Sequence, residues 1–336
     1  MFWLLLNFVI SATLIVIGAN RLSKYGEGIS KLTGLSSIWI GILLLGFITS
    51  LPELIVCIAS VSLVDAPDLG VGDIFGSNIF NLMIIAIIDI VQGKGPILHE
   101  AKERHILSAG ISILLAGIVG FSITFNTIQD ILRLPDIFKV GVDTLLVLSI
   151  YLIGTRLIFR FEKRESKLKK VVYRRTDEDK DLRTLGIKFV IISLIVVSSG
   201  IWLSFICDKI STATNLGHSF VGTIFLAITT SLPELSIAIS VVKSGMIDMA
   251  LGSIFGSNMF NIAVITISDL FYRKGPILSN LSTTHTLTIA LQVILTCIVI
   301  ISLMYRSKRS FLKLGLGVVS MIVFYSIGAW LLFKIH

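Results

Sequence analysis

The chain has 336 residues, of which 54% are hydrophobic and only 15% are charged, with a formal net charge of +8. A soluble domain is nearer to about 45–50% apolar and about 25% charged, so these proportions exclude a water-soluble globule. Apolar stretches fill most of the chain and leave no room for a soluble catalytic domain. We therefore expect a membrane protein that is not an enzyme, has no cofactor and binds no nucleic acid.

Ten apolar stretches predict ten transmembrane helices, because about 20 apolar residues cross a hydrocarbon core of about 30 Å. The predicted helices cover residues 2–19, 35–62, 71–91, 105–125, 139–160, 185–206, 218–242, 250–271, 285–305 and 312–333. An even number places both termini on the same side of the membrane.

Basic residues are distributed unevenly between the two sets of loops. The loops that follow odd-numbered helices carry 20 Lys and Arg residues, and the opposite side carries 6. The positive-inside rule predicts that the loops rich in Lys and Arg face the cytoplasm, with both termini outside, in the plasma or inner membrane. Nine basic residues lie within 161–183, so we expect a basic cytoplasmic linker at 161–184, most simply a solvated segment. A regulatory or lipid-headgroup role for this linker is the alternative.

Three short motifs occur twice, separated by 180 or 181 residues. "TSLPEL" stands at 49–54 and 230–235, "IFGSN" at 74–78 and 254–258, and "KGPIL" at 94–98 and 274–278. Many of the matched residues are polar, Gly or Pro, so a shared apolar composition does not explain the matches. We predict two five-helix repeats, 1–160 and 185–336. Because five is odd, the second repeat is inverted relative to the first, as in many secondary transporters whose site lies at the midplane.

Glu53 and Glu234 lie in otherwise apolar stretches at matching places in the two repeats. An ionised group at the bilayer centre costs at least about 2.5–3.5 kcal/mol, so this pair indicates function. Each Glu ends a Ser-x-x-Glu pattern, which predicts a capping box with Ser50 or Ser231 as the cap. A cap at this depth indicates a broken helix, and irregular backbone is tolerated there only where it lines a cavity.

A second polar cluster follows in the next predicted helix of each repeat. Ser77 and Asn81 are four residues apart and share a helical face, as do Ser257 and Asn261. With hydroxyls near each Glu, these side chains form a donor set made of oxygen, without His or Cys. Such a set favours a hard cation: Ca²⁺ takes about 6–8 oxygen ligands. Two carboxylates neutralise one Ca²⁺ or two Na⁺, and a pocket that holds either but not both supports exchange.

The segments "TSLPE" and "GSNxFN", present in both repeats, resemble the sodium/calcium exchanger family of the calcium/cation antiporter superfamily. The resemblance covers nearly the whole chain and implies that Glu53 and Glu234 bind Ca²⁺ and Na⁺ at the centre of the protein. We expect the protein to function as a monomer. The resemblance implies further ligands at Thr49, Ser50, Thr230, Ser231, Ser77, Ser257, Asn81 and Asn261, with the backbone carbonyls of Gly46 and Ala227 as weaker candidates. Ile48 and Thr229 replace the glycine that usually precedes Thr-Ser, and Asn261 stands where some members have Asp.

Two other functions are consistent with parts of this sequence pattern. A Ca²⁺/H⁺ antiporter of the same fold is one, because a carboxylate in a medium of low dielectric constant can carry a proton. A cation channel is the other, although inverted repeats with broken helices favour a carrier. With Glu53 and Glu234 as the only formal charges in the pocket, we expect a ratio nearer two Na⁺ per Ca²⁺ than three.

Other polar residues have less specific interpretations. His99, Glu100, Glu103 and His105 fit no standard metal-ligand spacing, and we expect them in an interfacial loop. Asp89 and Asp269 match across the repeats near the ends of their helices, where we expect them to cap or to line a vestibule.

Overall fold

The computed structural model describes residues 2–33, 46–93, 95–125, 140–166, 182–306, 310–311 and 314–335. Within these ranges, eight helices are long and apolar enough to cross a membrane, and a bent helix pair is a ninth candidate. The eight helices are α1 (Phe2–Thr33), α4 (Pro67–Gln92), α6 (His105–Phe125), α8 (Val142–Ser166), α9 (Leu182–Thr214), α13 (Ile247–Asp269), α14 (His285–Tyr305) and α15 (Leu316–Ile335). The chain is therefore an all-α polytopic membrane protein.

The two other predicted transmembrane segments contain interrupted helices. The segment in the second half comprises α10 (His218–Val221), the π-helix η3 (Gly222–Leu226), α11 (Ala227–Thr230) and α12 (Leu232–Lys243), with a bend of 41° before α12. Its counterpart in the first half comprises α2 (Gly46–Thr49), α3 (Leu51–Ala59) and the π-helix η2 (Ser60–Val64). The start of this predicted segment, 35–45, lies outside the described residues, so the number ten stays a prediction.

Several elements differ in length from the prediction. α1 and α9 contain 32 and 33 residues, which is about 48–50 Å of helix at about 1.5 Å per residue. Each helix continues through charged residues that end its apolar stretch. Short elements join some of the long helices: α5 (Ile97–Glu100), η4 (Ile277–Asn280), and an antiparallel pair of strands, β1 (Ser310–Phe311) and β2 (Leu314–Gly315). β1 precedes the predicted last transmembrane segment, β2 lies at its beginning, and α15 starts only at Leu316.

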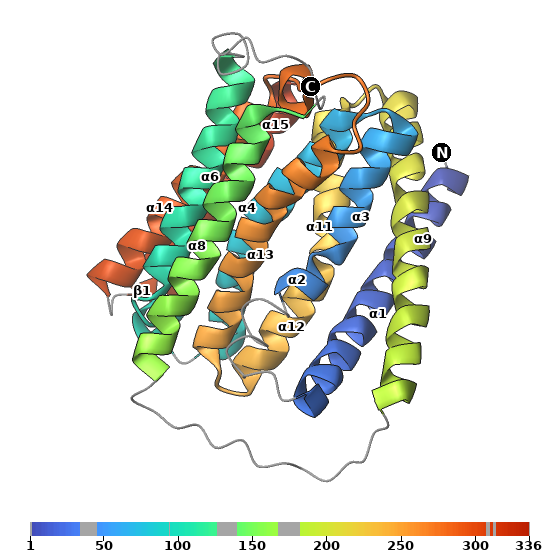
Figure 1. The fold of residues 1–336 in the computed structure, drawn as a ribbon. Helices are drawn as coiled ribbons and strands as arrows, with labels where there is room; N and C mark the ends of the chain where they lie inside the picture. The colour runs from blue at the N-terminus through green and yellow to red at the C-terminus, as the bar shows by residue number, and fades with distance from the viewer. Residues whose placement is uncertain are drawn as a thin grey trace.

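The two most buried long helices, α4 and α13, form the centre of the bundle. The most apolar 18-residue window is 72% buried in α4 and 89% buried in α13. In Figure 1, α6, α8, α14 and α15 lie on one side of this centre, and α1 and α9 pack together on the other. Among the long helices that the structure describes, α4 and α13 are the most buried, so a polar group placed there needs a partner inside the protein or a bound ion.

Glycine allows α4 to approach the interrupted segment of the second half. A Cβ atom on Gly76 would lie 2.3 Å from the carbonyl oxygen of Thr223, and one on Gly222 would lie 2.3 Å from that of Leu69. Both distances are far below a van der Waals contact, so side chains at these positions would separate α4 from η3. Small residues at such close crossings are typical of membrane helices.

The ends of the two halves lie at opposite ends of the bundle. α1 begins and α15 ends at one end, whereas α8 ends and α9 begins at the other (Figure 1). Each half therefore crosses the bundle an odd number of times. The linker predicted at 161–184 falls partly on α8 and α9, and residues 167–181 lie outside the described residues.

Candidate ion-binding site

The interrupted helices break at equivalent serines. Ser50 separates α2 from α3 with φ −88° and ψ 12°, and Ser231 separates α11 from α12 with φ −88° and ψ 1°. Pro52 and Pro233 occupy the first turn of the helix that follows, where the missing N–H of proline is harmless. The predicted helix breaks are present in both halves.

The predicted capping boxes are wrong. Neither Ser50 nor Ser231 makes a side-chain cap to its own helix. Instead, the Ser50 hydroxyl donates to Oε1 of Glu234 at 3.4 Å, and the Ser231 hydroxyl donates to Oε1 of Glu53 at 3.4 Å. The two breaks face each other, so each serine donates to a glutamate side chain from the other half. Both carboxylates are consequently held at the interface between the halves.

The other predicted hydroxyl ligands also form pairs across this interface. Thr49 Oγ1 lies 3.4 Å from Ser257 Oγ, and Ser77 Oγ lies 3.2 Å from Thr230 Oγ1. All ten side chains predicted as ligands are buried, nine of them with no exposed surface and Glu234 with 3%. The structure thus brings together residues that are separated by about half the chain.

Four asparagines form a reciprocal network beside these pairs. Asn81 Nδ2 donates to Oδ1 of Asn258 at 3.0 Å, and Asn261 Nδ2 donates to Oδ1 of Asn78 at 3.1 Å. Asn78 and Asn258 also donate to each other's backbone carbonyl, at 3.3 and 3.2 Å. The network engages the amide nitrogens of Asn81 and Asn261 and leaves their carbonyl oxygens available. Asn78 and Asn258 were missed as site residues although both stand in the repeated "GSN" motif.

Several buried oxygens near the helix breaks have no hydrogen-bond partner. They include Oε2 of Glu53 and of Glu234, and Oδ1 of Asn81 and of Asn261. An unsatisfied buried polar group costs about 1–3 kcal/mol, and a charged group costs more. These four acceptors come from both halves and match a hard cation such as Ca²⁺ or Na⁺, which binds oxygen. The chemistry of the available donor set therefore fits the predicted ions.

A third carboxylate lies beside the predicted ligands. Asp73 of α4 has no exposed surface, and its Oδ1 accepts a hydrogen bond from the Thr230 hydroxyl at 2.9 Å. The expectation that Glu53 and Glu234 are the only formal charges in the pocket is therefore wrong, and the two-for-one ratio loses its basis. The repeat comparison did not reveal Asp73, because the equivalent residue in the second half is Ser253.

The Ala227 carbonyl and the matched aspartates have structural partners. The Ala227 carbonyl accepts the Ser231 N–H at 3.1 Å, whereas Gly46 is the first residue of α2. Asp89 accepts the backbone N–H groups of Ile97 at 2.6 Å and Gly315 at 3.1 Å. Asp269 accepts those of Ile277 at 2.7 Å and Gly141 at 2.8 Å. Both aspartates thus hold loops against the ends of the central helices.

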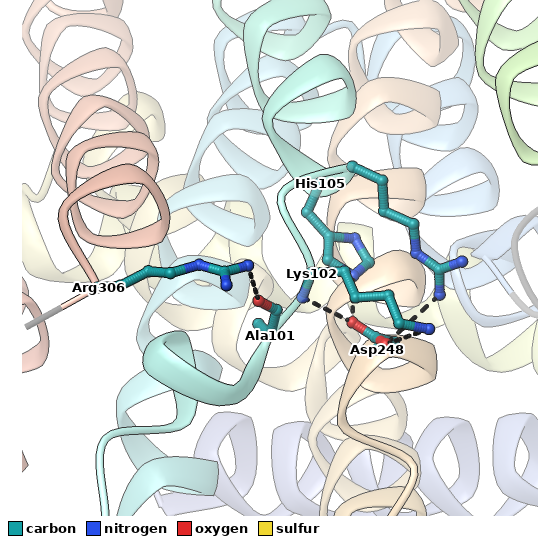
Figure 2. Close-up of polar contacts among 6 residues, drawn as sticks. Ala101, Lys102, His105, Asp248 and Arg306 are labelled. Carbon is teal, nitrogen blue, oxygen red and sulfur yellow. Dashed lines mark hydrogen bonds and ion pairs between the residues drawn. The ribbon is translucent and has the colours of Figure 1, made fainter. Parts of the chain in front are cut away.

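Another reciprocal pair of contacts involves the first residues of α6 and α14. His105 Nε2 lies 3.1 Å from Oδ1 of Asp248, and His285 Nε2 lies 2.9 Å from Oδ1 of Asp68. Asp248 also accepts the Lys102 backbone N–H at 3.0 Å (Figure 2). The Lys102 and Arg104 side chains form ion pairs with Asp248 at 3.2 and 3.7 Å.

The segment between α4 and α6 also forms ion pairs and hydrogen bonds with the end of α14 and with Gln92. Arg306 donates to the Ala101 carbonyl at 3.4 Å (Figure 2) and pairs with the exposed Glu103 at 3.5 Å. His99 Nδ1 lies 2.9 Å from the Arg306 carbonyl oxygen, and Glu100 accepts from Gln92 at 2.9 Å.

Outside the membrane-spanning helices, Asp65 forms an ion pair with Lys274 of the other half. This hydrogen bond raises the pKa of the Lys274 ammonium group above its ordinary value. The contact joins the end of η2 to the loop after α13.

Known proteins resemble this chain in sequence and in fold. The sodium/calcium exchanger MaX1 of Methanosarcina acetivorans is 28% identical, covering 90% of this chain and 93% of that protein. The inner membrane protein YrbG of Escherichia coli is 26% identical, covering 76% of each chain. A solved structure of the sodium-calcium exchanger NCX_Mj, soaked with Na⁺ and Sr²⁺, shares the fold, with a TM-score of 0.59 at 21% identity over 97% of this chain and 98% of that one.

A family model described as sodium/calcium exchanger protein matches this chain over residues 3–171 and again over 185–333. The two matches cover nearly the whole sequence and fall on either side of the predicted linker. The chain belongs to the sodium/calcium exchanger protein family.

Proposed function

We propose that this protein exchanges Ca²⁺ for Na⁺ across the plasma membrane, as a secondary antiporter that works by alternating access. The observation that carries the proposal is the set of unpartnered buried oxygens from both halves, on Glu53, Glu234, Asn81 and Asn261. Membership of the exchanger family supports the same ions. A donor set of this kind, at the contact between two halves that can move relative to each other, is what a cation antiporter needs.

The proposed site consists of the two carboxylates, the two asparagine carbonyl oxygens and six hydroxyls. The hydroxyls belong to Thr49, Ser50, Ser77, Thr230, Ser231 and Ser257. Ca²⁺ requires about 6–8 oxygens at about 2.3–2.6 Å, so a bound ion would recruit ligands from both halves. Because Na⁺ would use the same carboxylates, the two ions exclude each other from the pocket. This competition couples the inward movement of Na⁺ to the outward movement of Ca²⁺.

The proposed architecture has two inverted repeats, 1–160 and 185–336, joined by a cytoplasmic linker at 161–184. Reciprocal hydrogen bonds between residues separated by about 180 positions support this relation, as do the chain ends in Figure 1. The bias in loop charge supports a linker in the cytoplasm and termini outside. We propose a monomer as the functional unit, since the residues of the site come from a single chain.

A Ca²⁺/H⁺ antiporter is the second candidate. The observation that favours it is that Oε2 of both Glu53 and Glu234 is unpartnered, and a carboxylate oxygen in such an environment can accept a proton in place of a metal ion.

Transport by the purified protein in liposomes separates these possibilities. Uptake of radioactive Ca²⁺ is measured with an imposed gradient of Na⁺, of K⁺ or of H⁺ in turn. We expect only the Na⁺ gradient to drive accumulation. Accumulation driven by H⁺ alone would support the second candidate, and Ca²⁺ flux that never exceeds equilibration would indicate a channel.

Charge removal at the site tests the ligand assignment. We expect Glu53→Gln and Glu234→Gln each to abolish Ca²⁺ exchange, because each removes one of the charges that neutralise Ca²⁺ while preserving side-chain size. Glu103→Gln is the matched control, since that side chain is 65% exposed and lies in a peripheral loop. Near-normal exchange by either site variant would contradict the assignment.

A further inference from the structure

A cavity of about 310 Å³ lies between the end of α14 and the start of α15. Ile301 and Tyr305 of α14 line it on one side, Leu316 of α15 on another, and Leu98 and His99 of α5 on a third. None of the residues that line it belongs to the proposed ion site. Its volume is within the range of about 300–1,000 Å³ that is typical of pockets for small ligands.

Hydrogen bonds hold the walls of this cavity in place. Asp89, near the end of α4, accepts the backbone N–H groups of Ile97 in α5 at 2.6 Å and of Gly315 in β2 at 3.1 Å. His99 Nδ1 donates to the carbonyl oxygen of Arg306, directly after α14, at 2.9 Å. These bonds fix α5, β2 and the end of α14 relative to one another. A preformed pocket of this kind loses little conformational freedom when a ligand binds.

The cavity lies where the hydrocarbon core meets the headgroups. Ile301 is 63% exposed and Leu316 is 45% exposed, and both belong to helices that cross the membrane, so these side chains contact lipid. Tyr305 is the last residue of α14 and is 80% exposed. Tyrosine is enriched at the membrane–water interface, which places the polar end of the cavity at headgroup depth. A lipid molecule therefore has direct access to it.

The polar end of the cavity is basic. The adjoining segments, 93–104 and 306–313, contain seven basic and two acidic residues. Arg306 reaches from the end of α14 to the Ala101 carbonyl (Figure 2) and pairs with Glu103. Both contacts involve Nη2, and the side chain is 43% exposed. A guanidinium group has five N–H donors, so donors remain for an anionic headgroup.

The polar residues of the cavity are not repeated in the other half of the chain. Counted at a separation of 180 positions, His99, Tyr305 and Arg306 correspond to Ser279, Phe125 and Asn126. The repeated fold therefore does not require an imidazole, a phenol and a guanidinium group at these positions. By the positive-inside rule, this end of the bundle faces the cytoplasm, where the leaflet contains anionic lipids.

We propose that this cavity binds one anionic glycerophospholipid of the cytoplasmic leaflet, with an acyl chain between α14 and α15 and the phosphate group at Arg306 and Tyr305. Arginine binds phosphate through parallel charge-assisted hydrogen bonds, and the tyrosine hydroxyl supplies another donor. Basic pockets between transmembrane helices are typical sites for anionic headgroups. The inference does not depend on which ions the protein exchanges.

Native mass spectrometry of the purified protein in detergent tests the headgroup contact. The protein is titrated with phosphatidylglycerol, with phosphatidylcholine of the same acyl chains, and with glycerol 3-phosphate. We expect the first phosphatidylglycerol to bind about tenfold more tightly than phosphatidylcholine, and glycerol 3-phosphate not to bind. Arg306→Gln should remove this tenfold preference. Arg273→Gln is the matched control, because Arg273 is exposed and lies in the repeat-related loop after α13.

A substitution that fills the cavity tests the acyl-chain contact. Ile301→Trp should also reduce the affinity for phosphatidylglycerol about tenfold, whereas Ile294→Trp should not, since Ile294 is exposed on the same face of α14 two turns before the cavity. Equal affinity for the two lipids in the unaltered chain would overturn the proposal, as would an unchanged preference in both Arg306→Gln and Ile301→Trp. Glycerol 3-phosphate bound as tightly as phosphatidylglycerol, or a dimer in place of the lipid complex, would also overturn it.

Discussion

The asparagine network predicts an unequal response to two equivalent substitutions. The Asn78 side chain makes three hydrogen bonds, donating to the Asn258 carbonyl and to Gln292 Oε1 and accepting from Asn261. The Asn258 side chain makes two, donating to the Asn78 carbonyl and accepting from Asn81. At about 1 kcal/mol net for each bond, Asn78→Ala should lower the free energy of unfolding by about 3 kcal/mol and Asn258→Ala by about 2 kcal/mol.

Thermal unfolding of the purified protein in detergent measures this order. Asn78→Ala should melt at the lowest temperature, Asn258→Ala at an intermediate one and the unaltered chain at the highest. Asn7, whose Nδ2 makes a solvent-exposed hydrogen bond to the Trp3 carbonyl within α1, supplies the control, and Asn7→Ala should change the free energy of unfolding by less than about 0.5 kcal/mol.

The same substitutions should also weaken the binding of Ca²⁺. Each one releases the amide group that fixes a proposed ligand, Asn261 in the first case and Asn81 in the second. A higher Ca²⁺ concentration should then be needed for half-maximal uptake. The reasoning would be refuted if Asn258→Ala were the less stable of the two, or if both variants melted like the unaltered chain.

Two further predictions concern packing and orientation. Gly76→Ala should destabilise the fold by about 2 kcal/mol or more, because its Cβ would lie 2.3 Å from the carbonyl oxygen of Thr223, whereas Gly110→Ala, with no atom within 4 Å of its Cβ, should melt normally. In a background without native cysteines, a cysteine at Ser166 should be protected from impermeant thiol reagents in intact cells and one at His336 should react; the reverse pattern would mean that the predicted orientation is wrong.

The sequence predicts the helix breaks well because the signals there are local and occur twice. A glutamate in an apolar segment is rare, and a proline after a serine marks the first turn of a helix in both halves. The prediction of capping boxes was wrong for the same reason, since a local sequence pattern does not show which distant residue a side chain will contact. The hydroxyls of Ser50 and Ser231 instead donate to glutamate oxygens that lie 184 and 178 residues away in the sequence.

Helix length was underestimated where helices continue beyond the apolar stretch. α1 continues past Arg21 and Lys24 to Thr33, and α9 begins at Leu182, before Lys188. Hydropathy locates the part of a helix that lies in hydrocarbon, whereas backbone hydrogen bonding continues through charged residues in the headgroup region. The strand pair before α15 was missed because each strand has only two residues.

Residues that are the same in the two repeats determine the architecture. Residues that differ between the repeats determine which conformation is favoured. The aspartates that hold the loops and the histidine contacts at α6 and α14 occur in both halves. By contrast, Asp73 corresponds to Ser253 in the other repeat, and Lys102 corresponds to Ser282. In two identical inverted halves, the inward-open and outward-open conformations would have equal energies by symmetry. Any preference of the proposed antiporter for one conformation must therefore arise from the unmatched residues, which a comparison of repeats passes over.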